Sequence, residues 1–340
     1  MEWIFNWIST QSTSMIRNRI RNTLNYFRRK YDKLFHGNCL VLLYHRVTEL
    51  DHDPQLLSVT PDHFDKHLNY LRQHYRVLTI QEFAHHLQNH IRFPKNAVLI
   101  TFDDGYADNF LEAVPLLEKY NMQALFYVAT GTLGTSNEYW WDAIERIVLR
   151  NTIQPYVKEF ILHEHQYDLR NLTNEKRQTL YENLLPVLRR MPSSAREEKI
   201  NELAGIFQSE KGRASHRAMT FEELKQMHGS KAAVIGAHTH LHPSLAAIDY
   251  VPQLEEISTS KRILEAELGN EIKHFSYPFG TILDYNADTL RVVRELKFDL
   301  VAANYPEAVT RVSNPLAFPR FLVRDWDETT FAFQMKSFAK

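Results

Sequence analysis

Short apolar runs alternate with stretches of helical periodicity along most of the chain. The runs are brief and rich in β-branched residues, which is typical of buried strands. They lie at 38–47, 97–102, 123–128, 232–236, 272–280 and 298–304. Between them, apolar residues recur every three or four positions, which predicts helices at about 61–74, at 79–87, through 113–117, from 220, up to 268, and from 286. This alternation predicts an α/β protein with a parallel sheet, open or closed into a barrel.

Polar residues mark the ends of several predicted helices. Thr79 with Glu82, and Thr220 with Glu223, have the spacing of a capping box, which satisfies free backbone N–H groups at a helix start. Gly269 follows the helix that we expect to end near residue 268.

The middle third of the chain, about 135–217, interrupts the alternation. It is rich in charge and helical spacing and shows no clear strand, so we interpret it as a helical insertion. The tripeptide HEH at 163–165 is assigned to a solvated helix. The main domain is then 37–340, with the insertion inside it.

The first 36 residues form a separate basic segment with helical periodicity. It holds seven Lys or Arg residues and two acids, and its apolar residues are spaced by three or four. One interpretation is an amphipathic helix that lies on an anionic membrane surface. The alternative is a helix that packs on its own domain or on a partner subunit. The start makes a poor signal peptide, and no run approaches the ~20 apolar residues of a spanning helix. We therefore expect a cytoplasmic protein with peripheral contact at the inner membrane face through residues 1–35.

Composition narrows the classes of partner and of metal site. The chain has 40 basic and 41 acidic residues, so the overall charge does not indicate a nucleic-acid partner. The single cysteine, Cys39, excludes an intramolecular disulfide and a thiolate cluster.

The sequence TFDDGY places two adjacent carboxylates, Asp103 and Asp104, directly after a predicted buried strand. Burial of an ionised carboxylate is costly unless a cation or hydrogen bonds compensate it. A strand-ending turn is the structural alternative, because Asp and Gly favour turns. A glycosidase pair is disfavoured, since neighbouring side chains on a strand point to opposite sides.

Two histidines, His238 and His242, follow another predicted strand in the sequence HTHLHP. In a helical turn, residues four apart share a face, so both imidazoles can reach one ion, while His240 faces away. With one Asp they make a three-ligand site for Zn²⁺, with Co²⁺ or Ni²⁺ as alternatives, and leave a position for water. The second Asp is then free to accept a proton.

The motifs TFDDGY, H-T-x-x-H and YPFG, in this order, resemble the first three motifs of the polysaccharide deacetylases (carbohydrate esterase family 4, NodB homology). The resemblance implies a distorted (β/α) barrel of about seven strands and metal-dependent removal of an N-acetyl or O-acetyl group from a sugar. It also implies that Asp103 is the catalytic base and that Asp104, His238 and His242 are the metal ligands.

The third motif departs from the pattern of many relatives. Ser276 stands where they have an arginine that holds the catalytic Asp, whereas the backbone N–H of Phe279 can still serve an oxyanion hole. Arg320 is the expected replacement, and Arg324 is the alternative. The last forty residues contain no histidine for the general acid. The chain is similar to a permuted branch, the poly-N-acetylglucosamine deacetylases, in which the corresponding strand comes first in the sequence. This resemblance implies that His45, after the first strand, is the general acid.

We therefore expect a metal-dependent deacetylase acting on a glycan or on a lipid-linked or nucleotide-linked amino sugar. The alternatives are a catalytically silent carbohydrate-binding relative and a membrane-associated assembly factor in polysaccharide biosynthesis. Four large aromatic residues are candidates for stacking on sugar rings or for the core: Trp140, Trp141, Tyr277 and Trp326.

Overall fold

A curved sheet of parallel strands forms the centre of the molecule. The computed structural model describes residues 37–151, 153, 157–209 and 212–339, so the predicted basic segment at 1–36 lies outside the described residues. The strand order is β11 (Leu300–Ala302), β10 (His274–Ser276), β9 (Ala233–Ala237), β6 (Ala124–Val128), β5 (Ala97–Phe102), β1 (Cys39–Tyr44) and β12 (Phe321–Leu322), and β4 (Arg76–Val77) also pairs with β5. All these pairings are parallel.

The segment 315–323 contains β12 and bridges the gap between β11 and β1. Its first part pairs with β11, where the N–H of Ala303 donates to the oxygen of Phe318 at 2.8 Å. Its last part pairs with β1, where the N–H of Val323 donates to the oxygen of Leu43 at 2.9 Å. The first strand therefore lies beside the last one, and the predicted distorted (β/α) barrel of about seven strands is confirmed, with the short β4 as an eighth strand of the sheet.

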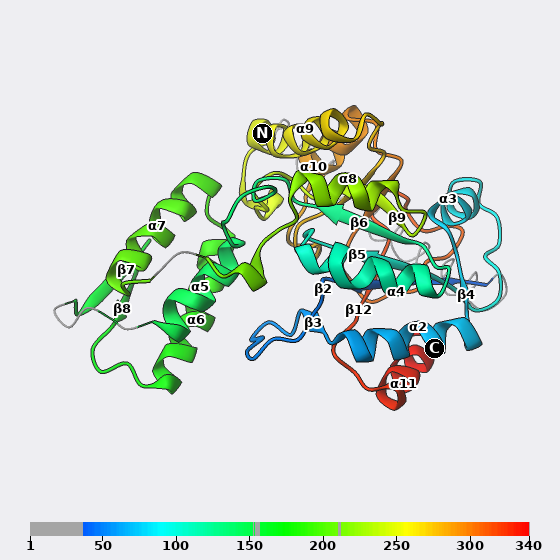
Figure 1. Cartoon of the computed structure of the whole chain (residues 1–340). Coiled ribbons are helices and arrows are strands. Elements are labelled where there is room, and N and C mark those ends of the chain that lie inside the picture. Colours follow the sequence, from blue (N-terminus) through cyan, green and yellow to red (C-terminus); the bar gives the residue numbers. More distant parts are fainter. Residues whose placement is uncertain (1–36, 152, 154–156, 210–211, 340) are drawn as a thin grey trace, which may run out of the picture.

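Helices surround the barrel (Figure 1). They are α2 (Pro61–His74), α3 (Ile80–Gln88), α4 (Val114–Lys119), α8 (Phe221–Gly229), α9 (Tyr250–Leu268), α10 (Ala287–Glu295) and α11 (Glu328–Phe338), and a π-helical turn, η1 (Asn109–Ala113), leads into α4. The capping boxes predicted from Thr79 and Thr220 are both present, and Asn286 begins a third. Gly269 ends α9 at φ 68°, where a glycine relieves the steric strain.

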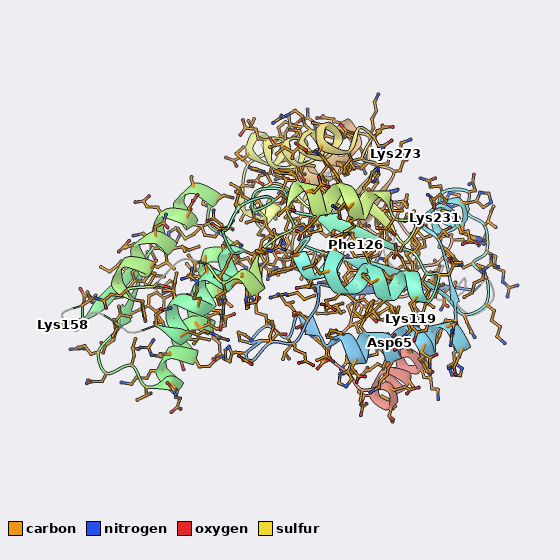
Figure 2. The ribbon with its side chains drawn as sticks, in the orientation of Figure 1. Asp65, Lys119, Phe126, Lys158, Lys231 and Lys273 are labelled. Atoms are coloured by element: carbon orange, nitrogen blue, oxygen red, sulfur yellow. The ribbon has the colours of Figure 1, made fainter. Side chains whose placement is uncertain are left out.

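Successive strand residues pack into two different cores, as the pleat of a strand requires. Leu99 and Tyr127 belong to a core that includes α3 and Phe318, while Phe102 and Phe126 belong to the core shared with the outer helices. Phe126 is labelled in Figure 2. Between two of those helices, Lys119 of α4 forms an exposed ion pair of 2.6 Å with Asp65 of α2. Both faces of the sheet are thus buried, which explains the continuous apolar runs in the sequence.

The insertion forms a lobe beside the barrel, drawn in green in Figure 1. It contains α5 (Trp140–Arg150), β7 (Glu159–Leu162), β8 (His165–Asp168), α6 (Asn174–Arg189) and α7 (Ser193–Ile206), and it has its own apolar core. The prediction that this region holds no strand was wrong, because β7 and β8 form an antiparallel hairpin. The assignment of HEH to a helix was also wrong. His163 and Glu164 form the turn of this hairpin, and His163 has φ 52°.

Smaller elements complete the chain. They are the pair β2 (Arg46–Val47) and β3 (Ser58–Val59), and the 3₁₀ turns η2 (Ala214–His216) and η3 (Leu245–Ala247). Within the described part of the chain, no helix is both long enough and apolar enough to cross a membrane.

Two glycines contrast a crowded position in the barrel with an open one in the insertion. A Cβ at Gly236 on β9 would lie 2.7 Å from the Cδ1 of Tyr127 and 3.0 Å from the backbone oxygen of His274. Gly236→Ala should therefore lower the free energy of unfolding by about 1–3 kcal/mol. A Cβ at Gly205, inside α7, would meet no atom within 4 Å, so Gly205→Ala should raise stability by about 0.5–1 kcal/mol. Urea unfolding of both variants measures the difference, and equal effects would contradict this packing.

Candidate metal centre and active site

Several of the predicted site residues lie at the carboxyl ends of β5, β9 and β10, three strands of the same parallel sheet. Asp103 and Asp104 follow β5, His238 follows β9, and Phe279 lies three residues after β10. Because the sheet is parallel, these ends lie on one side of the barrel, where loops can carry functional side chains without disturbing the core. The structure thus brings together residues that are up to 176 positions apart in the sequence.

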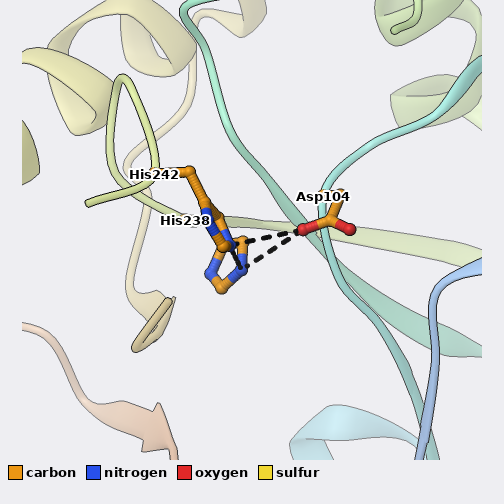
Figure 3. A group of neighbouring side chains, drawn as sticks. All are labelled: Asp104, His238 and His242. Atoms are coloured by element: carbon orange, nitrogen blue, oxygen red, sulfur yellow. Dashed lines mark hydrogen bonds and ion pairs between the residues drawn. The ribbon is translucent and has the colours of Figure 1, made fainter. Parts of the chain in front are cut away.

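Asp104, His238 and His242 form a compact triangle of donor atoms (Figure 3). The Oδ1 atom of Asp104 lies 3.6 Å from the Nε2 of His238 and 3.5 Å from the Nε2 of His242, and the two Nε2 atoms are 3.1 Å apart. Ligands about 2.0–2.1 Å from a tetrahedral zinc ion are about 3.3 Å from one another. The three donors therefore fit a single ion of this kind, and all three side chains are buried.

A hydrogen bond fixes the tautomer of His238. Its Nδ1–H donates to the backbone oxygen of Ser276 at 2.8 Å, which leaves the Nε2 lone pair facing Asp104. Such a bond from the far nitrogen is the usual support of a metal-binding imidazole, because it fixes the orientation of the ring.

The protonation states of the triangle also suit a cation. Burial lowers the pKa of both His238 and His242, so the imidazoles are neutral, which is the form that binds metal. Burial and the neighbouring charge of Asp103 raise the pKa of Asp104. This carboxylate lacks the positive partner that its neighbour has, and a divalent ion between the three donors would supply the missing charge.

The loop that carries the two histidines is not the helical turn that the sequence suggested. Residues 238–243 form an irregular loop in which Thr239 and His242 have φ of 65° and 53°. The backbone N–H of His242 donates to the Oγ1 of Thr239 at 3.1 Å. Pro243 prevents a longer helix at this point. His240 lies apart from the triangle, with its Nδ1 3.0 Å from the Oγ1 of Thr130.

Asp103 has a different partner, the guanidinium of Arg320. Nη1 donates to Oδ1 and Nη2 to Oδ2, each at 2.7 Å, in a buried two-pronged ion pair. Burial alone would raise the pKa of Asp103, but the charge and hydrogen bonds of Arg320, together with the influence of His238 and His45, outweigh it, and the pKa lies below its ordinary value. Asp103 is therefore ionised at neutral pH.

Ser276 completes this arrangement, although the sequence suggested no role for it. Its Oγ accepts from Nη2 of Arg320 at 2.8 Å and donates to Oδ2 of Asp103 at 3.2 Å. The guanidinium thus reaches Asp103 from the segment before β12 instead of from β10. Arg324, the alternative, donates to the backbone oxygens of Gln55 and Leu56 and does not bond Asp103.

His45 lies between β1 and β2, near the same carboxylate. Burial lowers its pKa to about 3, opposed by Asp103 and reinforced by the charges of Arg320 and His238. Its Nδ1 is buried and makes no hydrogen bond to any residue that the structure describes. The imidazole is therefore neutral in the free protein and has a ring nitrogen available.

Phe279 adopts a backbone conformation that is rare for a residue with a side chain. Its φ is 60°, and its N–H makes no hydrogen bond within the described residues. The ring lies 4.7 Å from that of His242, between centroids. Such strain is typical of functional sites, and here it occurs in a residue whose ring contacts one of the candidate metal ligands.

The four candidate aromatic residues occupy different surroundings. Tyr277 is fully buried and stacks on Tyr285, so it is a core residue. Trp141 is also buried, with its ring 4.6 Å from His242. Trp326 is half-buried and packs near Phe338, beside α11. Only Trp140, of these four, lines a pocket next to the histidine loop.

Two arginines of the insertion reach the loops of the site. Arg189 of α6 forms an ion pair with the buried Asp284 and lies 3.9 Å above the ring of Phe279. Arg196 of α7 donates to the backbone oxygen of Leu241 at 2.6 Å, next to His242. No pattern in the sequence indicated these contacts, because the arginines lie in a charge-rich helical region far from any motif.

Comparison with known proteins identifies the family. A sequence model of the family "Polysaccharide deacetylase" matches residues 90–192 and 206–301, which is more than half of the chain. The chain belongs to the polysaccharide deacetylase family. The match includes both carboxylates, both histidines and Phe279, and it ends before Arg320.

Relatives of this polysaccharide deacetylase family member support the assignment. A poly-β-1,6-N-acetyl-D-glucosamine N-deacetylase of Staphylococcus aureus is 29% identical over 157 residues, 42% of this chain and 53% of that protein. The match thus spans about half the length of this curated relative.

Solved structures show a similar fold. The deacetylase PplD of Streptococcus pyogenes is 19% identical with a TM-score of 0.58, covering 88% of this chain and 98% of that one. IcaB of Ammonifex degensii is 20% identical with a TM-score of 0.57, covering 89% and 97%.

The ion pair of Asp103 and Arg320 should be essential to stability. Arg320→Ala leaves a buried carboxylate without its partner and should cost about 3–5 kcal/mol at neutral pH. Because the pKa of Asp103 is lowered in the folded protein, this difference should shrink as the pH falls and the carboxylate is protonated. Denaturant unfolding at neutral and acidic pH measures it. Arg324→Ala is the control, and an equal loss in both variants would contradict a special role of Arg320.

Proposed function

We propose that this protein is a metal-dependent carbohydrate deacetylase that removes an N-acetyl group from an amino sugar of a glycan. The main support is the different surroundings of two adjacent carboxylates. Asp104 faces two neutral imidazoles, as a metal ligand does, whereas Asp103 is held ionised by Arg320, as a base must be. The family and the relatives named above agree with this chemistry.

Asp104, His238 and His242 would hold the ion. A divalent metal in this position supplies a water of lowered pKa and polarises the acyl oxygen of the substrate. Zinc is the ion that we favour, since the donors are two nitrogens and one oxygen; Co²⁺ and Ni²⁺ are the alternatives.

The remaining residues have separate tasks in the proposed reaction. Asp103 accepts the proton of the attacking water, and Arg320 keeps the carboxylate oriented and unprotonated beforehand. The N–H of Phe279, which has no partner among the described residues, donates to the oxyanion that develops on the acyl group.

His45 is the proposed donor of a proton to the leaving nitrogen. The free imidazole is neutral, with a pKa of about 3, so it must gain its proton during the reaction. The negative charge of the tetrahedral intermediate favours the protonated form and raises this pKa at that stage. Because His45 lies close enough to Asp103 to feel its charge, it would receive the proton that Asp103 took from the water and pass it on to the leaving nitrogen.

The substrate class follows from the relatives and remains part of the proposal. The name of the S. aureus relative points to a β-1,6-linked N-acetylglucosamine polymer. A lipid-linked or nucleotide-linked amino sugar is the alternative if the protein acts in the cytoplasm. Peripheral membrane contact through residues 1–35 stays a prediction from the sequence.

Replacement of the base separates metal binding from catalysis. In Asp103→Asn the three donors remain, so the protein should bind one Zn²⁺ per chain while acetate release falls by about 10²–10⁴-fold. Metal analysis and an acetate assay on N-acetylglucosamine oligosaccharides measure the two properties. His242→Ala is the matched control, because it should lose the metal as well. Full acetate release by Asp103→Asn would end the assignment of the base.

Replacement of His45 tests the proton donor. His45→Gln keeps a polar side chain of similar size but cannot deliver a proton, so kcat should fall by about 10²-fold or more with metal content unchanged. A substrate whose leaving group needs no proton, such as a nitrophenyl acetate ester, should be much less affected. If both substrates lose activity equally, His45 has another role.

A further inference from the structure

A pocket of about 480 Å³ lies between the insertion and the barrel. One wall is the loop that contains Leu241 and His242, and the opposite wall is made by α5 and α7. The volume falls within the ~300–1,000 Å³ range of small-molecule sites. Since His242 is also one of the three candidate metal ligands, the pocket begins directly beside the proposed reaction centre.

The wall formed by the insertion carries an apolar strip among polar residues. It includes the half-buried ring of Trp140, with Ala143 and Ile147 from α5 and Ile200 and Ala204 from α7. A flat apolar surface of this kind suits the C–H face of a sugar ring, with an aromatic ring as the stacking platform.

A buried cation lies over one face of the Trp140 ring. The guanidinium of Arg196 lies 4.9 Å from the centre of the Trp140 ring, and the residue is only 3% exposed. Nη2 donates to the oxygen of Leu241, whereas Nη1 is buried and makes no hydrogen bond to any described residue. An unsatisfied buried donor costs about 1–3 kcal/mol, so an acceptor brought by a ligand would remove a penalty.

The charges around Arg196 indicate what kind of acceptor fits. Glu197 and Glu256 both act electrostatically on Arg196, and Glu138 lies in the same pocket, paired with Arg146. A second anion would meet these carboxylates, whereas a neutral hydroxyl would not. The pocket therefore favours an uncharged, hydroxyl-bearing ligand over a phosphate or a carboxylate.

We propose that this pocket is a subsite for the sugar unit next to the one that is deacetylated, with Trp140 stacking on its ring and Arg196 donating to one of its hydroxyl groups. The inference rests on the proposed function. It makes the insertion a specificity element, because α5 and α7 would select oligosaccharides over single sugars.

Saccharide binding to the Asp103→Asn protein, loaded with Zn²⁺, tests the subsite without turnover. We expect a β-1,6-linked N-acetylglucosamine pentamer to bind more tightly than N-acetylglucosamine in calorimetric titration. Adding Trp140→Ala should raise the Kd of the pentamer about tenfold and that of the monosaccharide less than twofold. Trp140→Phe should restore most of the affinity, because it keeps a stacking ring.

A second variant fills the pocket with a large side chain on α7. Ala204→Trp places a large ring on α7, away from the metal ligands, and should weaken pentamer binding as much as Trp140→Ala does. Glu198→Trp, at an exposed position of the same helix outside the pocket, is the control and should bind like the parent. Zinc content and thermal unfolding show whether each variant is intact.

The outcomes separate the subsite from the reaction. The subsite is overturned if the parent binds no saccharide, if Trp140→Ala weakens monosaccharide and pentamer equally, or if Trp140→Ala binds the pentamer like the parent. If Ala204→Trp does not fold, the comparison of Trp140→Ala with Trp140→Phe still decides. If the saccharides bind as expected but the wild-type protein releases no acetate, the proposed function fails and the subsite stands.

Discussion

The burial of two neighbouring carboxylates is the constraint on which the rest of the site depends. Adjacent residues at a strand end direct their side chains differently, and Asp103 and Asp104 accordingly have different main partners. The fold gives Asp103 a guanidinium inside the barrel and gives Asp104 two neutral imidazoles. The first pair is complete within the chain, whereas the second calls for an added cation. Two chemically identical carboxylates are thus held in different electrostatic surroundings.

Local patterns in the sequence predicted the barrel and the meeting of Asp104, His238 and His242. Capping boxes such as that of Thr79 act over three residues, and apolar runs such as 97–102 report burial on both faces of a strand. The set of candidate donors could also be predicted from the sequence. Parallel strands place their carboxyl ends together, and each donor lies in the segment that follows a predicted strand. These features need no knowledge of distant contacts.

What the sequence could not predict depends on distant contacts or on weak local signals. Nothing near Arg320 distinguishes it from Arg324; only the closure of the barrel turns one toward Asp103 and the other toward a loop. The hairpin of β7 and β8 was missed because strands of four residues leave too little periodicity to detect. The contacts of Arg189 arise from the packing of the insertion against the barrel, more than 90 positions away in sequence from Asp284.

The attachment of the insertion has a mechanical consequence. Arg189 holds the loop of Phe279 through Asp284, and Arg196 holds the loop of His242 through Leu241. Both arginines belong to helices whose apolar sides form a separate core, so the geometry of the reaction centre is linked to the packing of a lobe that contains none of the metal donors. If the core of the insertion loosened, the loops of Phe279 and His242 would lose their alignment while the barrel itself stayed folded.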